Sequence, residues 1–260
     1  MLLSRPSPYS DECLVGYLLR VVERNGFKHI GHLLHHAGLN WKNNRVPVHK
    51  ILSGEFYLTP LLLALGLPES HSRTAPLHQS FQRLIDTPYL LVKYPKVCPD
   101  CLDELGYCRY EWSLLPTLAC TKHKKMLVDV GSTTGKRLGW YRQHLNRFDG
   151  ESNCIKPSGK CARPSAIQQS LYIESLLSGK KSGSSIPVVL QGLVFREALS
   201  LIHFIAHYQV RLLGGSFNPV AMQNNELGQC YQNVWAVLQA WPDSFYALLS
   251  QYIDHPMSSK

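Results

Sequence analysis

The sequence predicts a mainly α-helical protein in three parts: a helical bundle over residues 1–93, a cysteine-rich region over 94–165 and a C-terminal helical region over 166–260. Two observations support this prediction. Apolar residues recur at helical spacing in the first part and again in the last. In the central part, cysteines, prolines and aromatic residues replace the helical pattern.

The first part is expected to contain short helices joined by tight turns. Ser10 is a suitable N-cap for a first helix, and Asn25-Gly26 is a suitable end for it. Further helices are expected over 28–37, before Gly54, over 61–65 and over 77–85. This pattern is typical of helix-turn-helix modules, and a small helical domain without that role explains it equally well.

The last part is expected to contain four helices, over 166–178, 188–213 and 227–239 and from Pro242 onward, with a flexible connector over 179–185. Its charge is balanced, with five basic and five acidic residues. Residues 1–95 carry ten Lys or Arg against six Asp or Glu, and residues 96–165 carry twelve against seven. The basic first two thirds favour an anionic partner, whereas the last third suits packing or protein docking.

The first residues of the sequence do not predict a secretory signal peptide. Arg5 and Pro6 follow the first apolar residues at once, which leaves no apolar core of signal-peptide length. The apolar stretch from Leu61 to Leu67 is too short to span a bilayer. We therefore expect a cytoplasmic protein with no membrane partner. In that reducing compartment, closely paired cysteines are metal ligands more often than disulfides.

The cysteine-rich region contains two pairs of potential metal ligands. Cys98-x2-Cys101 is followed, after eighteen residues, by Cys120-x2-His123. Three thiolates and one imidazole match the tetrahedral ligand set of zinc, and an intervening loop of this length is typical of a zinc knuckle. Because all four positions belong to the protein, the predicted ion is structural. A buried thiol cluster or a disulfide would be the alternative.

Other cysteines and histidines make poorer ligand sets. Cys154 and Cys161 are separated by six residues, and a second site would also need Cys108 and His144. This spacing disfavours a second zinc ion. His29, His32, His35 and His36 lie on the second expected helix, where a polar face exposed to water or to an anionic partner is a better interpretation than a metal site.

A basic stretch follows the second ligand pair. Its members are Lys122, Lys124, Lys125, Lys136, Arg137, Arg142 and Arg147. Asp129 is the one acid among them, and Trp140, Tyr141 and Phe148 are interspersed. Such a stretch can bind phosphates and stack on bases, or bind a protein partner. An ordinary solvated face with core aromatics explains it equally well.

Familiar catalytic motifs are missing from the sequence. There is no Walker-type glycine loop, no Gly-x-Ser-x-Gly elbow and no His-Glu-x-x-His. Carboxylates are sparse and do not form a cluster of the kind that holds catalytic magnesium. The sequence therefore favours a protein that is not an enzyme.

Three segments resemble the TniQ family. They are Arg5-Pro-x-Pro-Tyr-Ser-Asp-Glu-x-Leu14 with Arg20 and Asn25-Gly26, then Cys98-Pro-x-Cys-Leu-x-Glu-x-Gly-Tyr107 with Arg109-Tyr110-x-Trp112 and Cys120-x-x-His123, and Trp241-Pro-x-Ser-Phe245. The likeness runs over most of the chain. It is greatest to the TniQ subunits of CRISPR-associated transposons that use type I effectors.

The resemblance implies a role in target selection for transposition, with a helix-turn-helix region, a zinc finger and a helical C-terminal part. Such TniQ subunits dock on the RNA-guided effector Cascade with its guide RNA, recruit the ATPase TnsC to target DNA and often form head-to-tail homodimers. Many relatives carry a second cysteine knuckle. Here Gly131 and Thr134 stand near the positions where its first cysteine pair would be, and only Cys154 and Cys161 remain. Direct sequence-specific DNA binding, as in the TnsD branch, is the main alternative. An enzyme that uses the zinc is the least favoured one.

Overall fold

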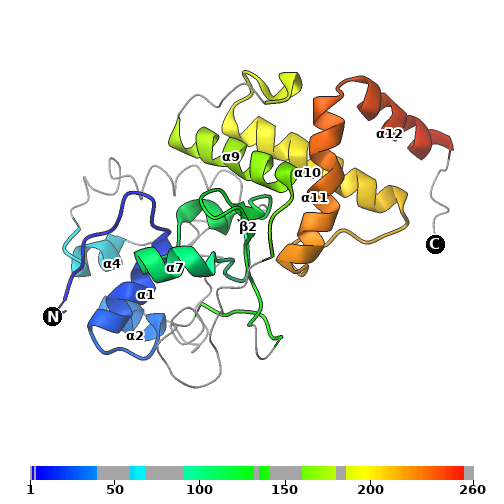
Figure 1. The fold of residues 1–260 in the computed structure, drawn as a ribbon. Helices are drawn as coiled ribbons and strands as arrows, with labels where there is room; N and C mark the ends of the chain where they lie inside the picture. The colour runs from blue at the N-terminus through cyan, green and yellow to red at the C-terminus, as the bar shows by residue number, and fades with distance from the viewer. Residues whose placement is uncertain are drawn as a thin grey trace. The chain divides into compact units, whose positions relative to one another are not determined.

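The protein is helical throughout most of the structure, a computed structural model that describes residues 2, 4–39, 59–67, 91–131, 135–140, 160–179 and 186–254 (Figure 1). Within these residues it contains eight α-helices, two 3-10 helices and one two-stranded sheet. The predicted mainly helical class is therefore confirmed. The chain divides into two compact units, Met1–Leu114 with Val128–Gly159, and Leu115–Leu127 with Lys160–Lys260.

The first unit contains short helices packed through apolar faces. They are α1 (Leu14–Arg24), α2 (Ile30–His36), α4 (Thr59–Ala64) and α7 (Pro99–Leu105), with a 3-10 turn over Tyr110–Ser113. α2 contacts both α1 and α4. The helices expected before Gly54 and over 77–85 lie outside the described residues. The helix-turn-helix arrangement remains a prediction.

Helix α1 begins later than the sequence predicts. Its N-cap is Cys13, whose Sγ accepts a hydrogen bond from the Gly16 amide at 3.2 Å, so the prediction of Ser10 as N-cap is wrong. The chain before Leu14 pairs with the segment that follows α7. Cys13 N donates to Cys108 O at 2.7 Å, and Glu12 forms a β-bridge with Arg109. This pairing keeps the backbone extended until residue 13.

Polar side chains hold the same two segments together. Asp11 accepts a 2.6 Å hydrogen bond from the Tyr107 hydroxyl and lies 3.0 Å from Arg109 Nε. Arg109 Nε also lies 2.9 Å from Glu111 Oε1. Burial and the hydrogen bond to Asp11 raise the pKa of Tyr107. The hydroxyl therefore stays protonated and remains a donor.

Helix α7 was not expected from apolar periodicity. Pro99 occupies its first turn, a position that needs no amide hydrogen, and Gly106 ends it in the left-handed conformation at φ 73°. A proline inside the start and a glycine just past the end are the sequence signals that could have found this helix.

The second unit contains the small sheet. Strands β1 (Ala119–Cys120) and β2 (Lys125–Met126) pair antiparallel, with Ala119 opposite Met126 and Cys120 opposite Lys125. A further segment extends this pairing, because Met126 N donates to Lys160 O and Ala162 N donates to Lys124 O, each at 2.9 Å.

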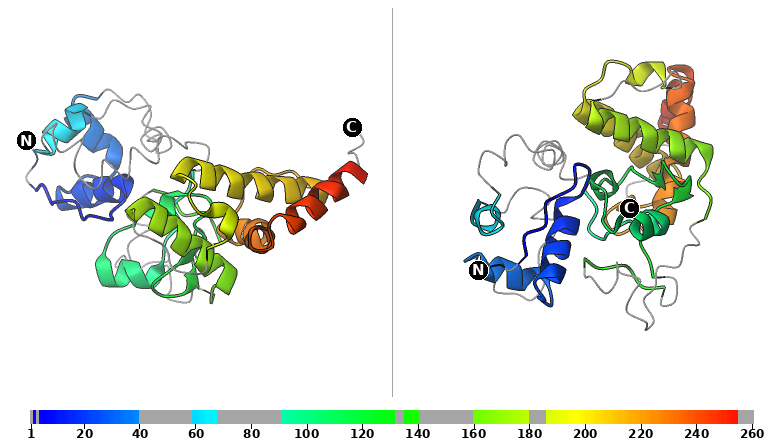
Figure 2. Two further views of the ribbon diagram at one scale, coloured as in Figure 1. Left: turned by 90° about the horizontal axis from the view of Figure 1, so that it is seen from above. Right: turned by 60° about the vertical axis from the view of Figure 1, so that its left-hand side comes forward.

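Helix α11 is the centre of the helical part of the second unit. The helices are α9 (Pro164–Ser178), α10 (Phe195–Leu212), α11 (Asn224–Gln239) and α12 (Asp243–Asp254), with a 3-10 turn over Val188–Leu190. α11 contacts α9, α10, α12 and the 3-10 turn, and Figures 1 and 2 show α10, α11 and α12, coloured yellow to red, packed together. Tyr231, Val234 and Trp235 bury the inner face of α11.

One of the expected C-terminal helices is interrupted. The sequence predicts a single helix over 188–213, but the structure has a 3-10 turn and then α10, separated at Gly192 with φ 82°. This part of the prediction is wrong because only glycine readily adopts that φ and an α-helix cannot continue through it. The expected helices over 166–178, over 227–239 and from Pro242 correspond to α9, α11 and α12.

Buried side chains attach the hairpin to these helices. Ser170 Oγ accepts from the amides of Leu118 and Ala119 at 3.1 Å each. Asn224 Nδ2 donates to Leu118 O at 3.0 Å and to Leu127 O at 2.7 Å. These bonds fix the hairpin that carries Cys120. Over the described segments, the helices are too short or too polar for any of them to cross a membrane.

Candidate metal centre

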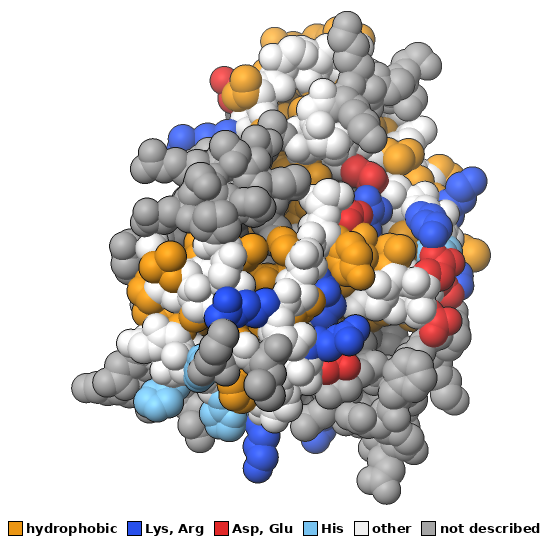
Figure 3. Space-filling view, turned by 90° about the vertical axis from the view of Figure 1, so that its left-hand side faces the viewer, with side chains coloured by type: hydrophobic (Ala, Val, Ile, Leu, Met, Phe, Trp, Pro, Cys, Tyr) orange, Lys and Arg blue, Asp and Glu red, His pale blue; other side chains and the backbone are white. Residues whose placement is uncertain are grey.

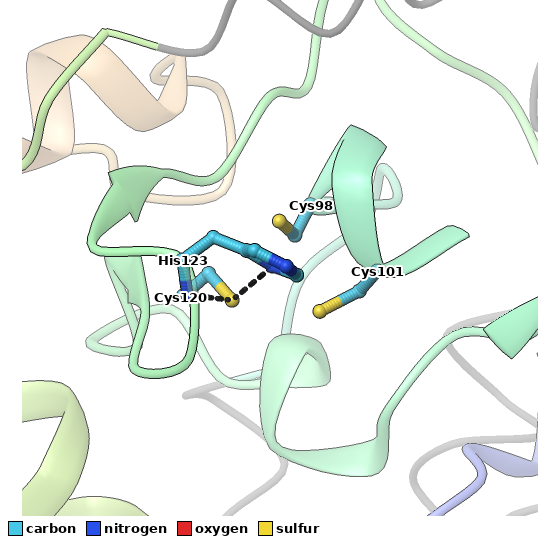
Figure 4. A group of neighbouring side chains, drawn as sticks. All are labelled: Cys98, Cys101, Cys120 and His123. Carbon is cyan, nitrogen blue, oxygen red and sulfur yellow. Dashed lines mark hydrogen bonds between the residues drawn. The ribbon is translucent and has the colours of Figure 1, made fainter. Parts of the chain in front are cut away.

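The four predicted zinc ligands come together in the structure (Figure 4). Cys98 is the N-cap of α7, and Cys101 lies in the first turn of that helix. Cys120 ends β1, and His123 lies in the turn that leads to β2. Figure 4 shows the side chains from the α7 segment and from the hairpin directed toward one another.

The geometry of the cluster suits a tetrahedral ion. All four ligand atoms lie within 4.8 Å of one another. Cys120 Sγ is 3.6 Å from His123 Nδ1. In a tetrahedral zinc site with ordinary Zn–S and Zn–N bonds, a sulfur and a nitrogen ligand are separated by about 3.6 Å. The hairpin pair therefore already has the spacing that zinc requires.

Burial supports a structural ion. Cys98, Cys101 and Cys120 are buried, and His123 is half-buried. The backbone amide of His123 donates to Cys120 Sγ at 3.4 Å, an interaction that stabilises negative charge on the sulfur. Three thiolates and one imidazole would fill the coordination of zinc without leaving a position open to substrate.

The turn between Cys120 and β2 has a left-handed residue. Lys124 has φ 53°, and its amide donates to Cys120 O at 2.9 Å. A non-glycine residue in this conformation is strained, and the surrounding hydrogen bonds must stabilise it. Here the backbone pairing of the hairpin does so, and the turn brings His123 back toward Cys120.

A buried lysine lies beside the cluster. Lys96 Nζ donates to Leu114 O at 2.8 Å, and the side chain is buried. Burial lowers the pKa of Lys96 to about 7, and the negative charge of Asp129 opposes only part of this shift. The neighbouring backbone is held by Val97 and Val128, whose amides each donate to the other's carbonyl.

Cys108 and Cys161 do not join the cluster. Cys108 is buried against Cys13, and the hydrogen bond with Cys13 together with burial raises the pKa of the Cys108 thiol well above its ordinary value. A protonated thiol is a poor metal ligand. Cys161 is exposed in the segment that pairs with β2. Cys154 and His144 lie outside the described residues.

The histidines of α2 form a surface group. His32, His35 and His36 are exposed, and the rings of His29 and His32 are 4.0 Å apart between centroids. Phe27 contacts His32 and His36. Histidine side chains gather at the lower left of the face in Figure 3, where lysine and arginine side chains are mixed with apolar ones.

The predicted basic residues differ in their exposure and in their contacts. Lys122 and Lys124 are exposed in the hairpin turn, and Lys125 is half-buried in β2. Arg137 forms an ion pair with the buried Asp129 and lies over the Tyr94 ring, so it contributes to packing. Lys136 is exposed. Arg142 and Arg147 lie outside the described residues.

Two exposed basic residues were missed by the sequence analysis. Lys160 lies in the segment that pairs with β2, and Arg163 follows that segment. Both residues lie after the basic stretch in the sequence, so the sequence did not indicate that their segment pairs with the hairpin.

Comparison with known proteins associates the metal cluster with one family. Residues 3–127 match the family model of TniQ, a family of transposition-associated targeting proteins that are not enzymes. The match includes α1 and all four residues of the cluster, and residues 128–260 lie outside it. None of the curated proteins matches the chain significantly.

Proposed function

We propose that the chain selects targets for transposition, and that Cys98, Cys101, Cys120 and His123 hold one structural Zn²⁺ ion that stabilises it. The TniQ match over residues 3–127 is the observation that supports the targeting role. The ligand types, their burial and the 3.6 Å sulfur–nitrogen distance support zinc. In this role the ion would hold α7 and the hairpin in place and would not touch a substrate.

The form of targeting that we favour is that of an adaptor. The protein would dock on the RNA-guided effector Cascade of a type I CRISPR system and recruit the TnsC ATPase to the marked DNA, with a homodimer as one assembly. The sequence likeness to TniQ subunits of such transposons supports this choice. The balanced charge of residues 166–260 also suits a protein-docking surface.

Direct recognition of a DNA site, as in the TnsD branch, is the second candidate. The exposed Lys122 and Lys124 on the hairpin favour it, because clustered cations neutralise phosphates. Such a protein would bind its attachment site without an effector. The two candidates therefore differ in whether the isolated chain binds a specific DNA sequence.

Co-purification separates the two candidates. The tagged chain is expressed with the CRISPR effector encoded beside it and, separately, is incubated with a fragment library of host DNA. Capture of the effector with no enriched DNA sequence supports the adaptor. Enrichment of one DNA site by the chain alone supports direct recognition. Failure of both experiments would contradict the targeting role.

A further inference from the structure

The second unit contains a cavity beside the hairpin, lined by both polar and apolar side chains. Its volume is about 310 Å³. Leu118, Met126 and Tyr231 form its apolar part. The polar part consists of Lys160, Arg163, Ser165, Asn225, Gln229 and Gln232. Two cations and several hydrogen-bond donors therefore line the cavity together with apolar side chains.

The charged residues that line this cavity are all cationic. Two of the lining residues are cationic and none is acidic. Lys160 and Arg163 are both exposed, and neither forms an ion pair with any residue that the structure describes. The nearest acid along α11, Glu226, accepts a hydrogen bond from the Gln223 amide and is not part of the lining. The cavity therefore favours an anion.

The backbone extends this positive surface onto the hairpin. Ala162 N donates to Lys124 O at 2.9 Å, so the segment that carries Lys160 and Arg163 runs beside the turn that carries Lys124. Lys124 is exposed and also has no ion pair within the described residues. Three cations on adjacent segments suit a ligand with several negative charges in a row better than a single small anion.

We propose that the cavity of Lys160 and Arg163, together with the adjoining Lys124, binds the phosphodiester backbone of target DNA. The amides of Asn225, Gln229 and Gln232 would donate to phosphate oxygens, as side-chain amides do in sequence-independent DNA contacts. This inference rests on the proposed targeting role, because it names the surface that would contact DNA. It assigns no base recognition to these residues.

The test compares two variants of equal charge. Lys160→Gln/Arg163→Gln removes the cavity cations, and Arg196→Gln/Arg211→Gln removes two exposed arginines of α10 that do not line the cavity. DNA binding is measured by fluorescence anisotropy with a random-sequence duplex over a range of salt concentrations. The cavity variant is expected to bind on the order of tenfold more weakly at 0.1 M salt, with a salt slope smaller by about 2. The control variant should stay close to the wild type.

The thiol of Cys161 gives a second readout, because it is exposed and lines the same cavity. Bound duplex is expected to slow its alkylation by iodoacetamide several-fold in the wild-type chain. The half-buried Cys230 lies outside the lining and serves as the internal reference in peptide mass spectrometry. Protection of Cys161 places the duplex at the cavity itself.

Several outcomes would overturn the inference. They are a wild-type chain that does not bind DNA, a cavity variant that binds like the control, and unprotected Cys161. Binding of poly-glutamate instead of DNA through the same two cations would assign the cavity to an acidic protein.

If the effector is still captured in these cases, the adaptor role stands and only the assignment of the DNA-binding surface is wrong. If the cavity binds DNA but both co-purification experiments fail, the targeting role is wrong instead.

Discussion

Single residues of the metal cluster provide the most direct test of the zinc assignment. Cys101→Ser or Cys120→Ser removes one of four ligands from a buried site. We expect the zinc content to fall from about one ion per chain to near zero, and amide hydrogen exchange over residues 95–130 to accelerate, because metal binding and local folding are coupled. Elemental analysis and hydrogen exchange measure the two effects.

Cys230→Ser is the matched control for these variants. Cys230 is half-buried on α11 and does not belong to the cluster. This variant should keep its zinc and its exchange pattern. Unchanged zinc content in Cys101→Ser and Cys120→Ser would show that the ligand set is wrong.

His203 makes stability of the second unit depend on pH. Its Nδ1 lies within hydrogen-bond distance, 3.0 Å, of the Tyr231 hydroxyl, and burial raises the pKa of Tyr231, so that hydroxyl remains protonated. Burial, followed by the nearby His207, lowers the pKa of His203. The unfolded chain then binds the proton more tightly than the folded chain does.

The sign of the effect follows from this difference. The contribution of His203 to stability is complete above the ordinary histidine pKa of about 6.5 and is lost as pH falls through the lower folded-state pKa. We expect the urea midpoint of the wild type to fall more steeply between about pH 7 and pH 5 than that of His203→Gln. The other histidines titrate in both proteins, and equal slopes would contradict the assignment.

At the same scale, local patterns were predictable and distant pairs were not. The cluster could be found because each ligand pair has a characteristic local spacing, Cys98-x2-Cys101 and Cys120-x2-His123. The Asp11–Tyr107 hydrogen bond joins residues 96 positions apart, and no periodicity indicates it. Both residues belong to sequence motifs shared with the TniQ family. The structure shows that the contact between them joins the segment before α1 to the segment after α7.

At the scale of elements, helix α1 depends on a buried ion pair. Arg20 Nε and Nη2 donate to the two carboxylate oxygens of Glu12 at 2.9 and 2.6 Å, and the Glu12 side chain is fully buried. The Arg20 guanidinium also lies over the Tyr9 ring, which stacks on Tyr107. Losing Arg20 would leave the Glu12 carboxylate without its cation.

We expect Arg20→Gln to destabilise the first unit by about 3 kcal/mol, because it breaks a buried pair and leaves one charge behind. Hydrogen exchange of the α1 amides measures the opening of that helix. Arg24→Gln is the control, since Arg24 is exposed in the last turn of the same helix. Similar exchange rates in both variants would mean that the Glu12 pair does not hold α1.

The attachment of α11 to the hairpin gives a second test at this scale. The buried Asn224 amide donates to two hairpin carbonyls. Asn224→Ala would leave both carbonyls without this donor and is expected to lower stability by about 2 kcal/mol. The thermal midpoint measures this loss. Asn233→Ala, at an exposed position of α11, should leave the midpoint nearly unchanged.

The existence of several helices was predictable from the sequence, but some of their boundaries were not. α9, α11 and α12 were predictable because each keeps helical periodicity over several turns. α1 starts at Leu14 rather than after Ser10 because pairing with residues 108 and 109 extends the preceding chain. The break before α10 depends on the backbone of Gly192, whose conformation a hydrophobic pattern does not report.

For the whole molecule, the sequence gives the number of basic residues in each region but does not show which of them lie together after folding. The sequence indicated a basic region and assigned it to the stretch from Lys122 to Arg147. Backbone pairing instead places Lys160 and Arg163 beside the hairpin turn, whereas Arg137 pairs with Asp129. Linear counting cannot make this distinction, because it depends on which segments become neighbours after folding.

Removing the metal tests the zinc assignment on the intact chain. A structural zinc site contributes several kcal/mol to folding, and 1 kcal/mol shifts the thermal midpoint of a domain of this size by about 2–4 °C. We therefore expect a chelator to lower the midpoint by roughly 10 °C. Added Zn²⁺ should restore it, and Mg²⁺ should not, because thiolates and imidazole are poor ligands for a hard cation. An unchanged midpoint after confirmed loss of zinc would show that the cluster does not stabilise the fold through a bound ion.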